Sequence, residues 1–309
     1  MVQTPVLFET FVRVEYARQV WDAIKAAQPK KLYFYSNKGR AEKEGEIDRN
    51  NEIRSWVNEI DWDCELHTFF RDECVDIYTS LKGAIDWVFS NEPEAIVLED
   101  DCVPSLAFFS FCDQMINRYR DNDKVWCISG DNYLDYVPKD ADYFFSHYHF
   151  MYGWASWSNR WHQIQWGKLP VEELIHTDIL KDIYKTKQQV RFRQRELKRV
   201  KDFVNTTNCW DFALGIEMDY HKAVTVHPNK HLVTCVGLFG EHSNVSQETM
   251  FHKRCVCQEE TYTIKQHPKV IAADMGYDYP FFIKLENYMR LYNRALRHFK
   301  ALLSKHFKK

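Results

Sequence analysis

The stretch "EAIVLEDDCVPSLAFFSF", residues 94–111, runs a short apolar segment directly into three adjacent carboxylates, Glu99, Asp100 and Asp101. The aliphatic segment AIVL has the composition of a buried strand. Like charges side by side repel each other, so they must be solvated, paired with cations or bound to a ligand. The stretch therefore predicts a strand that ends in a ligand-binding site.

Around this strand, residues 5–130 alternate short β-rich runs with helical ones, the pattern of βαβ units and a mainly parallel sheet. Strands are expected in PVLFETF, KKLYFYSN, CELHTFF, EAIVLED and KVWCISGDNY, and helices in EYARQVWDAIKAAQ, NEIRSWVNEI, YTSLKGAIDWVFSN and LAFFSFCDQMINRYRDN. In open α/β sheets, ligands bind outside the carboxyl ends of the strands. The acidic triplet lies at one such end, and the turn from Ser36 to Arg40 lies at another.

The second half of the chain is less regular. Residues 143–166 concentrate aromatic side chains, which we interpret as a rigid binding wall. Residues 181–204 are expected to form a very basic helix, either with a solvated face or in contact with an anionic surface. Residues 281–309 are expected to form a basic amphipathic helix that docks on the domain or lies on an anionic membrane.

Composition bounds the class of protein. The 309 residues are 45% hydrophobic, which is ample for a folded core, and the net charge of −3 argues against a nucleic-acid partner. The nine cysteines include no CxxC pair, which favours reduced thiols in a cytosolic protein. No segment approaches the roughly 20 apolar residues of a membrane span. We therefore expect a cytoplasmic protein, with peripheral contact at the inner face of the membrane as the one membrane association that the basic helices suggest.

Carboxylates at the end of a strand form a hard-oxygen site suited to Mg²⁺ or Mn²⁺. Such an ion keeps coordination positions for phosphates and water, and it can neutralise a diphosphate leaving group. The acidic triplet is thus a candidate metal site for chemistry on a phosphorylated substrate.

Six stretches, taken in order, resemble a known family. They are PVLFETFVR, AIDWVFSNEPEAIVLEDDCVPSLAFFSFC, ISGDNY, YGWASWSNRW, NCWDFAL and HPNKHLVTCVGLFGEH. In these stretches the chain resembles bacterial nucleotide-diphospho-sugar transferases of the haemolysin-like glycosyltransferase group, related to N-acetylglucosaminyltransferase I. The resemblance implies the α/β GT-A glycosyltransferase fold, with one Rossmann-like, mainly parallel sheet and flanking helices. It further implies a catalytic domain over 1–245, divided into a nucleotide-sugar-binding half (1–130) and an acceptor and base half (131–245), before a helical extension at 246–309.

The resemblance also implies roles for particular residues. Asp211 would be the general base, and Mn²⁺ or Mg²⁺ would be bound by Asp101 and His242. The donor nucleotide and its sugar would be bound by Arg13, Ser36, Arg40, Glu99, Asp100, Gly130 and Asp131. The wall on which sugar rings stack would be formed by Tyr152, Gly153, Trp154, Trp157 and Trp210.

These roles predict a metal-dependent inverting glycosyltransferase. An acceptor hydroxyl that attacks the anomeric carbon in line needs one base and no protein nucleophile, and this single displacement inverts the configuration. The resemblance favours a UDP-sugar donor, with UDP-GlcNAc the first to test, and a glycan or lipid-linked glycan acceptor in bacterial surface-glycan assembly. A structural role is the alternative for two residues: Asp211 as the N-cap of the helix FALGIEM, and His242 as a structural histidine.

Three other functions remain open at this point. A sugar-phosphate nucleotidyltransferase also uses a strand-end Asp and Mg²⁺, but it cradles a triphosphate in an N-terminal Gly-rich loop, and residues 1–30 contain no glycine. A glycoside hydrolase would use Asp101 and Asp211 as its two carboxylates. A non-catalytic carbohydrate-binding module would use the aromatic residues alone. Nucleotide binding separates the transferases from the last two.

Overall fold

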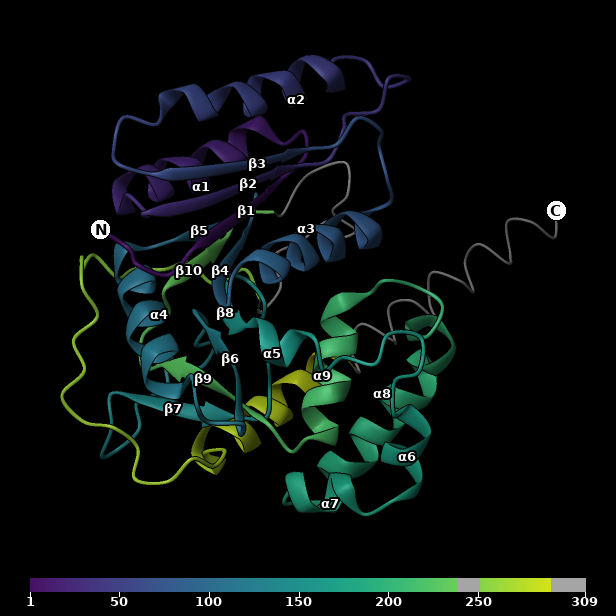
Figure 1. The fold of residues 1–309 in the computed structure, drawn as a ribbon. Coiled ribbons are helices and arrows are strands. Elements are labelled where there is room, and N and C mark those ends of the chain that lie inside the picture. Colours follow the sequence, from purple (N-terminus) through teal and green to yellow (C-terminus); the bar gives the residue numbers. More distant parts are fainter. Residues whose placement is uncertain (238–250, 290–309) are drawn as a thin grey trace, which may run out of the picture.

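The computed structural model describes residues 1–237 and 251–289 and contains a mixed sheet of eight strands, in the order β3-β2-β1-β4-β8-β6-β9-β7 (Figure 1). The strands are β1 Val6–Thr10, β2 Lys31–Ser36, β3 Glu65–Phe70, β4 Glu94–Glu99, β6 Val125–Ser129, β7 Tyr143–Ser146, β8 Trp154–Trp157 and β9 Val224–Pro228. Strands β3, β2, β1 and β4 are parallel, β8 runs antiparallel to β4 and β6, and β7 runs antiparallel to β9. A second sheet pairs β5 (Cys102–Pro104) with β10 (Val233–Cys235) in antiparallel fashion. The predicted α/β class and the mainly parallel main sheet are confirmed, and the small second sheet is an addition that the sequence did not predict.

Helices cover both faces of the large sheet. The helices are α1 Val14–Ala27, α2 Glu46–Ser55, η1 Trp56–Glu59, α3 Ile77–Asn91, α4 Leu106–Tyr119, α5 Ser158–Trp161, α6 Val171–His176, α7 Ile179–Ile183, α8 Lys187–Val204 and α9 Trp210–Tyr220. Residues 275–289 are also helical. Helices α1, α2 and α4 pack on one face, and α3 with α5 to α9 on the other. Figure 1 shows α6 to α9 grouped at one side of the sheet.

The central strands are apolar over most of their length because both of their faces are covered. In β1, Val6 and Phe8 belong to the core under α1 and α4, whereas Leu7 points into the core under α3. Helix α1 presents Ala17, Val20 and Ile24 as one buried stripe, at the spacing that an amphipathic helix requires. In both β1 and α1, the spacing of the apolar residues along the sequence matches the faces that the structure buries.

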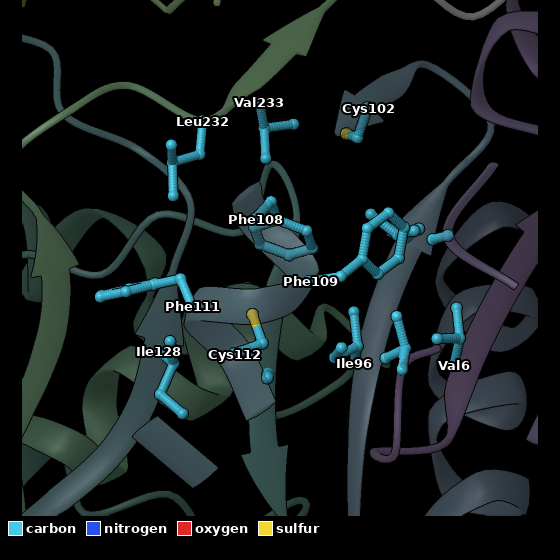
Figure 2. Packing of buried hydrophobic residues seen from close by; sticks show 14 of the residues in the cluster. Val6, Ile96, Cys102, Phe108, Phe109, Phe111, Cys112, Ile128, Leu232 and Val233 are labelled. Carbon is cyan, nitrogen blue, oxygen red and sulfur yellow. The ribbon is translucent and has the colours of Figure 1, made fainter. Parts of the chain in front are cut away.

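The apolar run that follows the acidic triplet forms the buried face of α4. Figure 2 shows Phe108, Phe109 and Cys112 between the sheet residue Ile96 and Val233 of the small sheet. All of these side chains are at most 1% exposed. The helix thus fixes the turn between β4 and β5, which carries Asp100 and Asp101.

The basic segment predicted at 181–204 is two helices, α7 and α8, because Thr186 caps a new helix. The Thr186 hydroxyl accepts from the backbone N–H of Gln189 at 3.2 Å, and the Gln189 side chain bonds back to the Thr186 N–H. Part of the basic charge is neutralised by ion pairs, in which Arg195, Arg199 and Lys201 lie near Glu286, Glu196 and Glu172.

The remaining predicted segments differ in part from the observed elements. The aromatic stretch at 143–166 forms two strands, β7 and β8, and the short helix α5. Residues 251–274 contain no helix or strand, so within the predicted extension at 246–309 the described helix begins at 275. None of the nine cysteines forms a disulfide. Among the described helices, none has both the length and the apolar character needed to cross a membrane.

Candidate functional site

The acidic triplet lies at the carboxyl edge of the parallel strands, where the sequence predicts it. Strand β4 ends at Glu99, and the neighbouring β1 places Glu9 directly opposite Glu99 in the register. Asp100 and Asp101 occupy the turn into β5. Gly237 lies so close that a Cβ atom on it would meet Asp101 Oδ2 at 2.0 Å. The side chain of Asp101 is therefore confined between this glycine and the strand ends.

Arg13 bridges two of these carboxylates. It lies at the N-terminus of α1, donates from Nη1 to Asp101 Oδ2 at 2.8 Å, and pairs through Nη2 with Asp100. Burial lowers the pKa of Arg13, but Asp100 and Asp101 outweigh this effect and raise it above its ordinary value. Burial raises the pKa of Glu99 to about 8, and the charge of Asp101 adds to the rise. The cluster thus holds more negative charge than Arg13 alone stabilises.

Glu9 is a site residue that the sequence analysis missed. Its side chain is 2% exposed, and neither carboxyl oxygen has a hydrogen-bond partner among the described residues. Asp100 Oδ2 is also buried without a partner. Burial raises the pKa of Glu9, followed by the charges of Glu99 and Asp100. The available signal was one acid inside the otherwise apolar strand PVLFETF, where an unpaired buried carboxyl is costly.

A cavity of about 860 Å³ opens above these carboxylates, and we call it the polar cavity. Its lining includes Arg13, Lys38, Arg40, Asp76, Asp100 and Asp101. Arg40 is held by Glu46, with Nε 3.0 Å from Oε2. Ser36, predicted to contact the nucleotide, is fully buried and receives hydrogen bonds from Asn50 and Arg54 instead. Ser36 therefore does not line the polar cavity, and its hydroxyl links β2 to α2 next to it.

A second cavity of about 530 Å³ lies beside the first, and we call it the aromatic cavity. Its lining includes Tyr148, Phe150, Tyr152, Tyr184, Trp210 and Phe281, together with Asp211. Glu99, Ile77 and Leu81 line both cavities. The two cavities therefore meet at the end of β4.

Asp211 lies in the first turn of α9, facing the aromatic cavity. The N-cap of this helix is Cys209 and makes no side-chain capping bond, so the alternative role of Asp211 as the N-cap is wrong. Asp211 Oδ1 accepts from the Phe212 N–H at 2.9 Å and from the Cys209 thiol at 3.1 Å. No hydrogen bond from the described residues falls on Oδ2. One oxygen is thus fixed, and the other is left for a ligand.

The predicted sugar wall is only partly present. Tyr152 and Trp210 line the aromatic cavity, but Trp154 and Trp157 are at most 1% exposed and line neither cavity. Trp154 stacks on Trp210 with ring centroids 5.2 Å apart. Gly153 has a φ of 84° and packs against Val233 in the core. Gly153, Trp154 and Trp157 thus lie in the core in this structure, away from both cavities.

Two further predicted donor residues lie outside both cavities. Gly130 packs against Phe108 and Val233, and Asp131 is 1% exposed and bonds to Ser129. Val233 belongs to β10, so the small sheet covers this strand end. The structure therefore gives Gly130 and Asp131 no contact with the polar cavity. His242 lies outside the described residues.

The carboxylates at the strand ends fit a hard divalent cation that shares its ligands with a substrate. Within residues 1–237 and 251–289, no group of three His, Cys, Asp or Glu side chains could hold a metal. Mg²⁺, however, is commonly held by one or two carboxylates, with phosphates and water completing its shell. Asp101 is 16% exposed and lines the polar cavity, and the adjacent Asp100 has an unpartnered oxygen. The residues present can therefore supply the protein's share of such a site.

Comparisons with known proteins give only distant matches. No family model matches the chain, and no curated protein matches it significantly. Among solved structures, the mannosyltransferase PcManGT from Pyrobaculum calidifontis, in complex with GDP-Man and Mn²⁺, is 11% identical with a TM-score of 0.36, over 52% of this chain and 46% of that chain. The chain thus spans less than half the length of that enzyme.

Two other similar structures are a glycosyltransferase and a diphosphocytidyl-methylerythritol synthase. The glycosyltransferase GlyE of Streptococcus pneumoniae is 10% identical with a TM-score of 0.30, over 53% of this chain and 36% of that chain. The 4-diphosphocytidyl-2C-methyl-D-erythritol synthase of Anaerococcus prevotii is 9% identical with a TM-score of 0.35, over 65% of this chain and 83% of that chain. Similarities this low carry no information about the activity.

Proposed function

We propose that the protein is a metal-dependent inverting glycosyltransferase that moves a sugar from a nucleoside-diphosphate donor to a hydroxyl group of a glycan. The observation that carries this proposal is that Glu99 lines both cavities. A transfer reaction needs two substrates that meet at one point, and the two cavities meet at this residue. The polar cavity would hold the donor and the aromatic cavity the acceptor.

The polar cavity has the groups that a nucleoside diphosphate needs. Its volume of about 860 Å³ lies within the range of small-molecule sites. Lys38 supplies a cationic donor for phosphate oxygens, and Arg13 and Arg40, which are paired with Asp100, Asp101 and Glu46, hold further positive charge at the same lining. Arg13 orients Asp101 through Oδ2. A divalent cation bound at Asp101 would neutralise the negative charge of the diphosphate leaving group. The transferred sugar would then lie beside Glu99.

The aromatic cavity has the base that the acceptor needs. Asp211 Oδ1 is held by Phe212 and Cys209, so Oδ2 can accept the proton of an acceptor hydroxyl. Attack from this side, opposite the leaving diphosphate, is a single displacement and inverts the anomeric carbon. Catalysis then rests on positioning and on one proton transfer, with no covalent enzyme intermediate.

The experiment that tests this function is isothermal titration of UDP, GDP, CDP and UDP-GlcNAc, each with and without Mn²⁺, against the wild type and Asp101→Ala. We expect one nucleotide to bind tightly, and its binding to require both Mn²⁺ and Asp101. UDP is the first choice because of the family resemblance. Absence of binding by all four would overturn the transferase and favour a hydrolase or a carbohydrate-binding module.

A second assay separates glycosyl transfer from nucleotidyl transfer. The full chain is incubated with the bound nucleoside's triphosphate and hexose 1-phosphates, and released pyrophosphate is measured. We expect none, because residues 1–30 contain no glycine and so cannot form the N-terminal Gly-rich loop that cradles a triphosphate. Pyrophosphate release that depends on the sugar phosphate would identify a nucleotidyltransferase.

A further inference from the structure

We infer that the acceptor is uncharged at the sugar that enters the aromatic cavity. This inference rests on the proposed function and names the substrate class of its second site. It follows from the charges that line the cavity and from how each of them is already used. Among the described lining residues, the side chains that carry a full charge at neutral pH or contain an ionisable carboxyl are Glu99, Arg193, Asp211 and Asp219.

Arg193 is the one Lys or Arg among the described lining residues, and it forms an ion pair with Asp219. Its Nε donates to Asp219 Oδ2 at 2.5 Å, and its Nη2 donates to the Gly215 carbonyl at 3.3 Å. Asp219 is 5% exposed and also accepts from the Tyr184 hydroxyl at 3.0 Å. The charge of Arg193 is therefore balanced by Asp219, and an incoming anion would have to compete with this buried carboxylate for the same cation.

The other basic groups in the lining do not replace it. His147 and His149 both line the cavity, and burial lowers the pKa of each, which favours the neutral ring. The carboxylate of Asp211 forms no ion pair with a described residue, so it adds negative charge to the same space. An anionic acceptor would lose its hydration shell and meet the charge of Asp211, and among the described lining residues the one Lys or Arg is already paired with Asp219. The described lining therefore disfavours such a group.

The rest of the lining fits an uncharged sugar. Aromatic rings from several separate segments surround the cavity, at Tyr78, Tyr148, Trp210 and Phe281 among others. Aromatic rings bury large apolar areas and suit the C–H faces of a sugar or an aryl substituent. Sugar phosphates and uronic acids are therefore disfavoured as the residue next to Asp211. The diphosphate of any lipid-linked acceptor would have to remain outside the cavity.

The test uses pairs of acceptors that differ by one charge. p-Nitrophenyl glycosides of glucose, galactose and N-acetylglucosamine are compared with the uronic acid or the 6-phosphate of the same ring. Transfer is measured on the full chain with the nucleotide-sugar found by titration, and binding is measured by saturation-transfer NMR on protein loaded with UDP and Mn²⁺. We expect kcat/KM and binding to favour the neutral member at least tenfold.

The possible outcomes separate failure of the acceptor class from failure of the proposed function. Equal or better use of the charged member, with nucleotide binding intact, would overturn the acceptor class while the proposed transferase stands. Binding of neither member to the nucleotide-loaded protein would show that the aromatic cavity is not an acceptor-sugar site. Absence of nucleotide binding in the wild type would overturn the proposed function, and the acceptor class with it.

A pair of variants tests whether charge is the cause. Phe192 lines the aromatic cavity and not the polar cavity, and its ring lies 5.6 Å from Phe282. Phe192→Lys adds a cation, and Phe192→Gln removes the ring without adding charge. We expect Phe192→Lys to improve the ratio of charged to neutral acceptor at least tenfold over Phe192→Gln, with UDP affinity as the folding control. The same ratio in both variants would contradict the inference.

Discussion

The polar cavity and the aromatic cavity share a wall but satisfy their buried polar groups in opposite ways. In the polar cavity, neither Glu9 nor Oδ2 of Asp100 has a hydrogen-bond partner within the part of the chain that the structure describes. In the lining of the aromatic cavity, Asp219 accepts hydrogen bonds from both Arg193 and Tyr184. Native proteins rarely leave buried polar groups unpaired, so the unpaired carboxyls indicate where a ligand completes the structure. The paired groups indicate a wall whose shape is fixed before any ligand binds.

The strongest test of this comparison is Asp211→Asn, which should abolish transfer without weakening donor binding. An amide cannot accept the hydroxyl proton, and general-base catalysis typically contributes 10²- to 10⁴-fold, so we expect kcat to fall by about a thousandfold. UDP affinity should not change, because Asp211 does not line the polar cavity. Asp178→Asn, at a carboxylate that is 77% exposed, is the control. Substantial remaining activity would show that another group is the base.

Arg193→Met should destabilise the protein strongly because it leaves Asp219 buried without its cation. Removal of one partner of a buried ion pair typically costs about 3–5 kcal/mol, whereas replacement of both partners by apolar residues is often neutral. The double variant Arg193→Met with Asp219→Leu should therefore recover most of the loss. Urea denaturation measures the free energy of unfolding of each. If the double variant is no more stable than the single one, the pair is not what supports the aromatic cavity.

The sequence predicted the elements of the fold because strands covered on both faces and amphipathic helices have different periods. The acidic triplet was also placed correctly, since the run AIVL identifies the strand and the carboxyl end follows from its direction. Glu9 was missed because a single acid in an apolar strand does not show whether a partner lies opposite it. In the structure, the opposite residue is Glu99, another acid.

The two tryptophans of YGWASW show what composition cannot determine. Trp154 and Trp157 are three residues apart in β8, so their side chains point to opposite faces of the sheet. They belong to the two different core clusters on those faces. Helices cover both faces, and both rings are therefore buried. A stacking wall could be predicted only with knowledge of which face stays open, which depends on the packing of α9 and other distant elements.

Asp278→Asn should remove a pH dependence of stability that originates next to the aromatic cavity. Asp278 is 1% exposed and accepts from Ser146 Oγ at 2.5 Å and from the His147 N–H at 3.1 Å. Burial raises its pKa to about 7, above the value of about 3.9 in an unfolded chain. The folded state therefore favours the protonated form, so this stability is complete below about pH 4 and is lost as the pH rises through 7.

The slope that one such proton contributes is at most about 1.4 kcal/mol per pH unit. Thermal unfolding of the wild type and of Asp278→Asn at pH 5 and pH 8 measures it. The wild type should lose more stability than the variant between the two values. The helix that carries Asp278 also carries Phe281 and Leu285, which line the aromatic cavity and not the polar cavity. The affinity for UDP, which the polar cavity would bind, should therefore be unaffected. Parallel pH profiles for the two proteins would place the titrating group elsewhere.

The smallest expected effect tests whether the thiol of Cys209 positions the base. Burial raises the pKa of Cys209, followed by the charge of Asp211, so the thiol stays protonated and donates to Asp211 Oδ1 at 3.1 Å. Cys209→Ala removes this donor, whereas Cys209→Ser retains one. A hydrogen bond contributes about 1 kcal/mol, so kcat of the Ala variant should fall about fivefold. The KM for the donor should stay constant in both variants, since Cys209 lies outside the polar cavity. Equal loss in the Ser and Ala variants would mean that the thiol acts through packing at the start of α9, and that the Phe212 N–H alone orients Asp211.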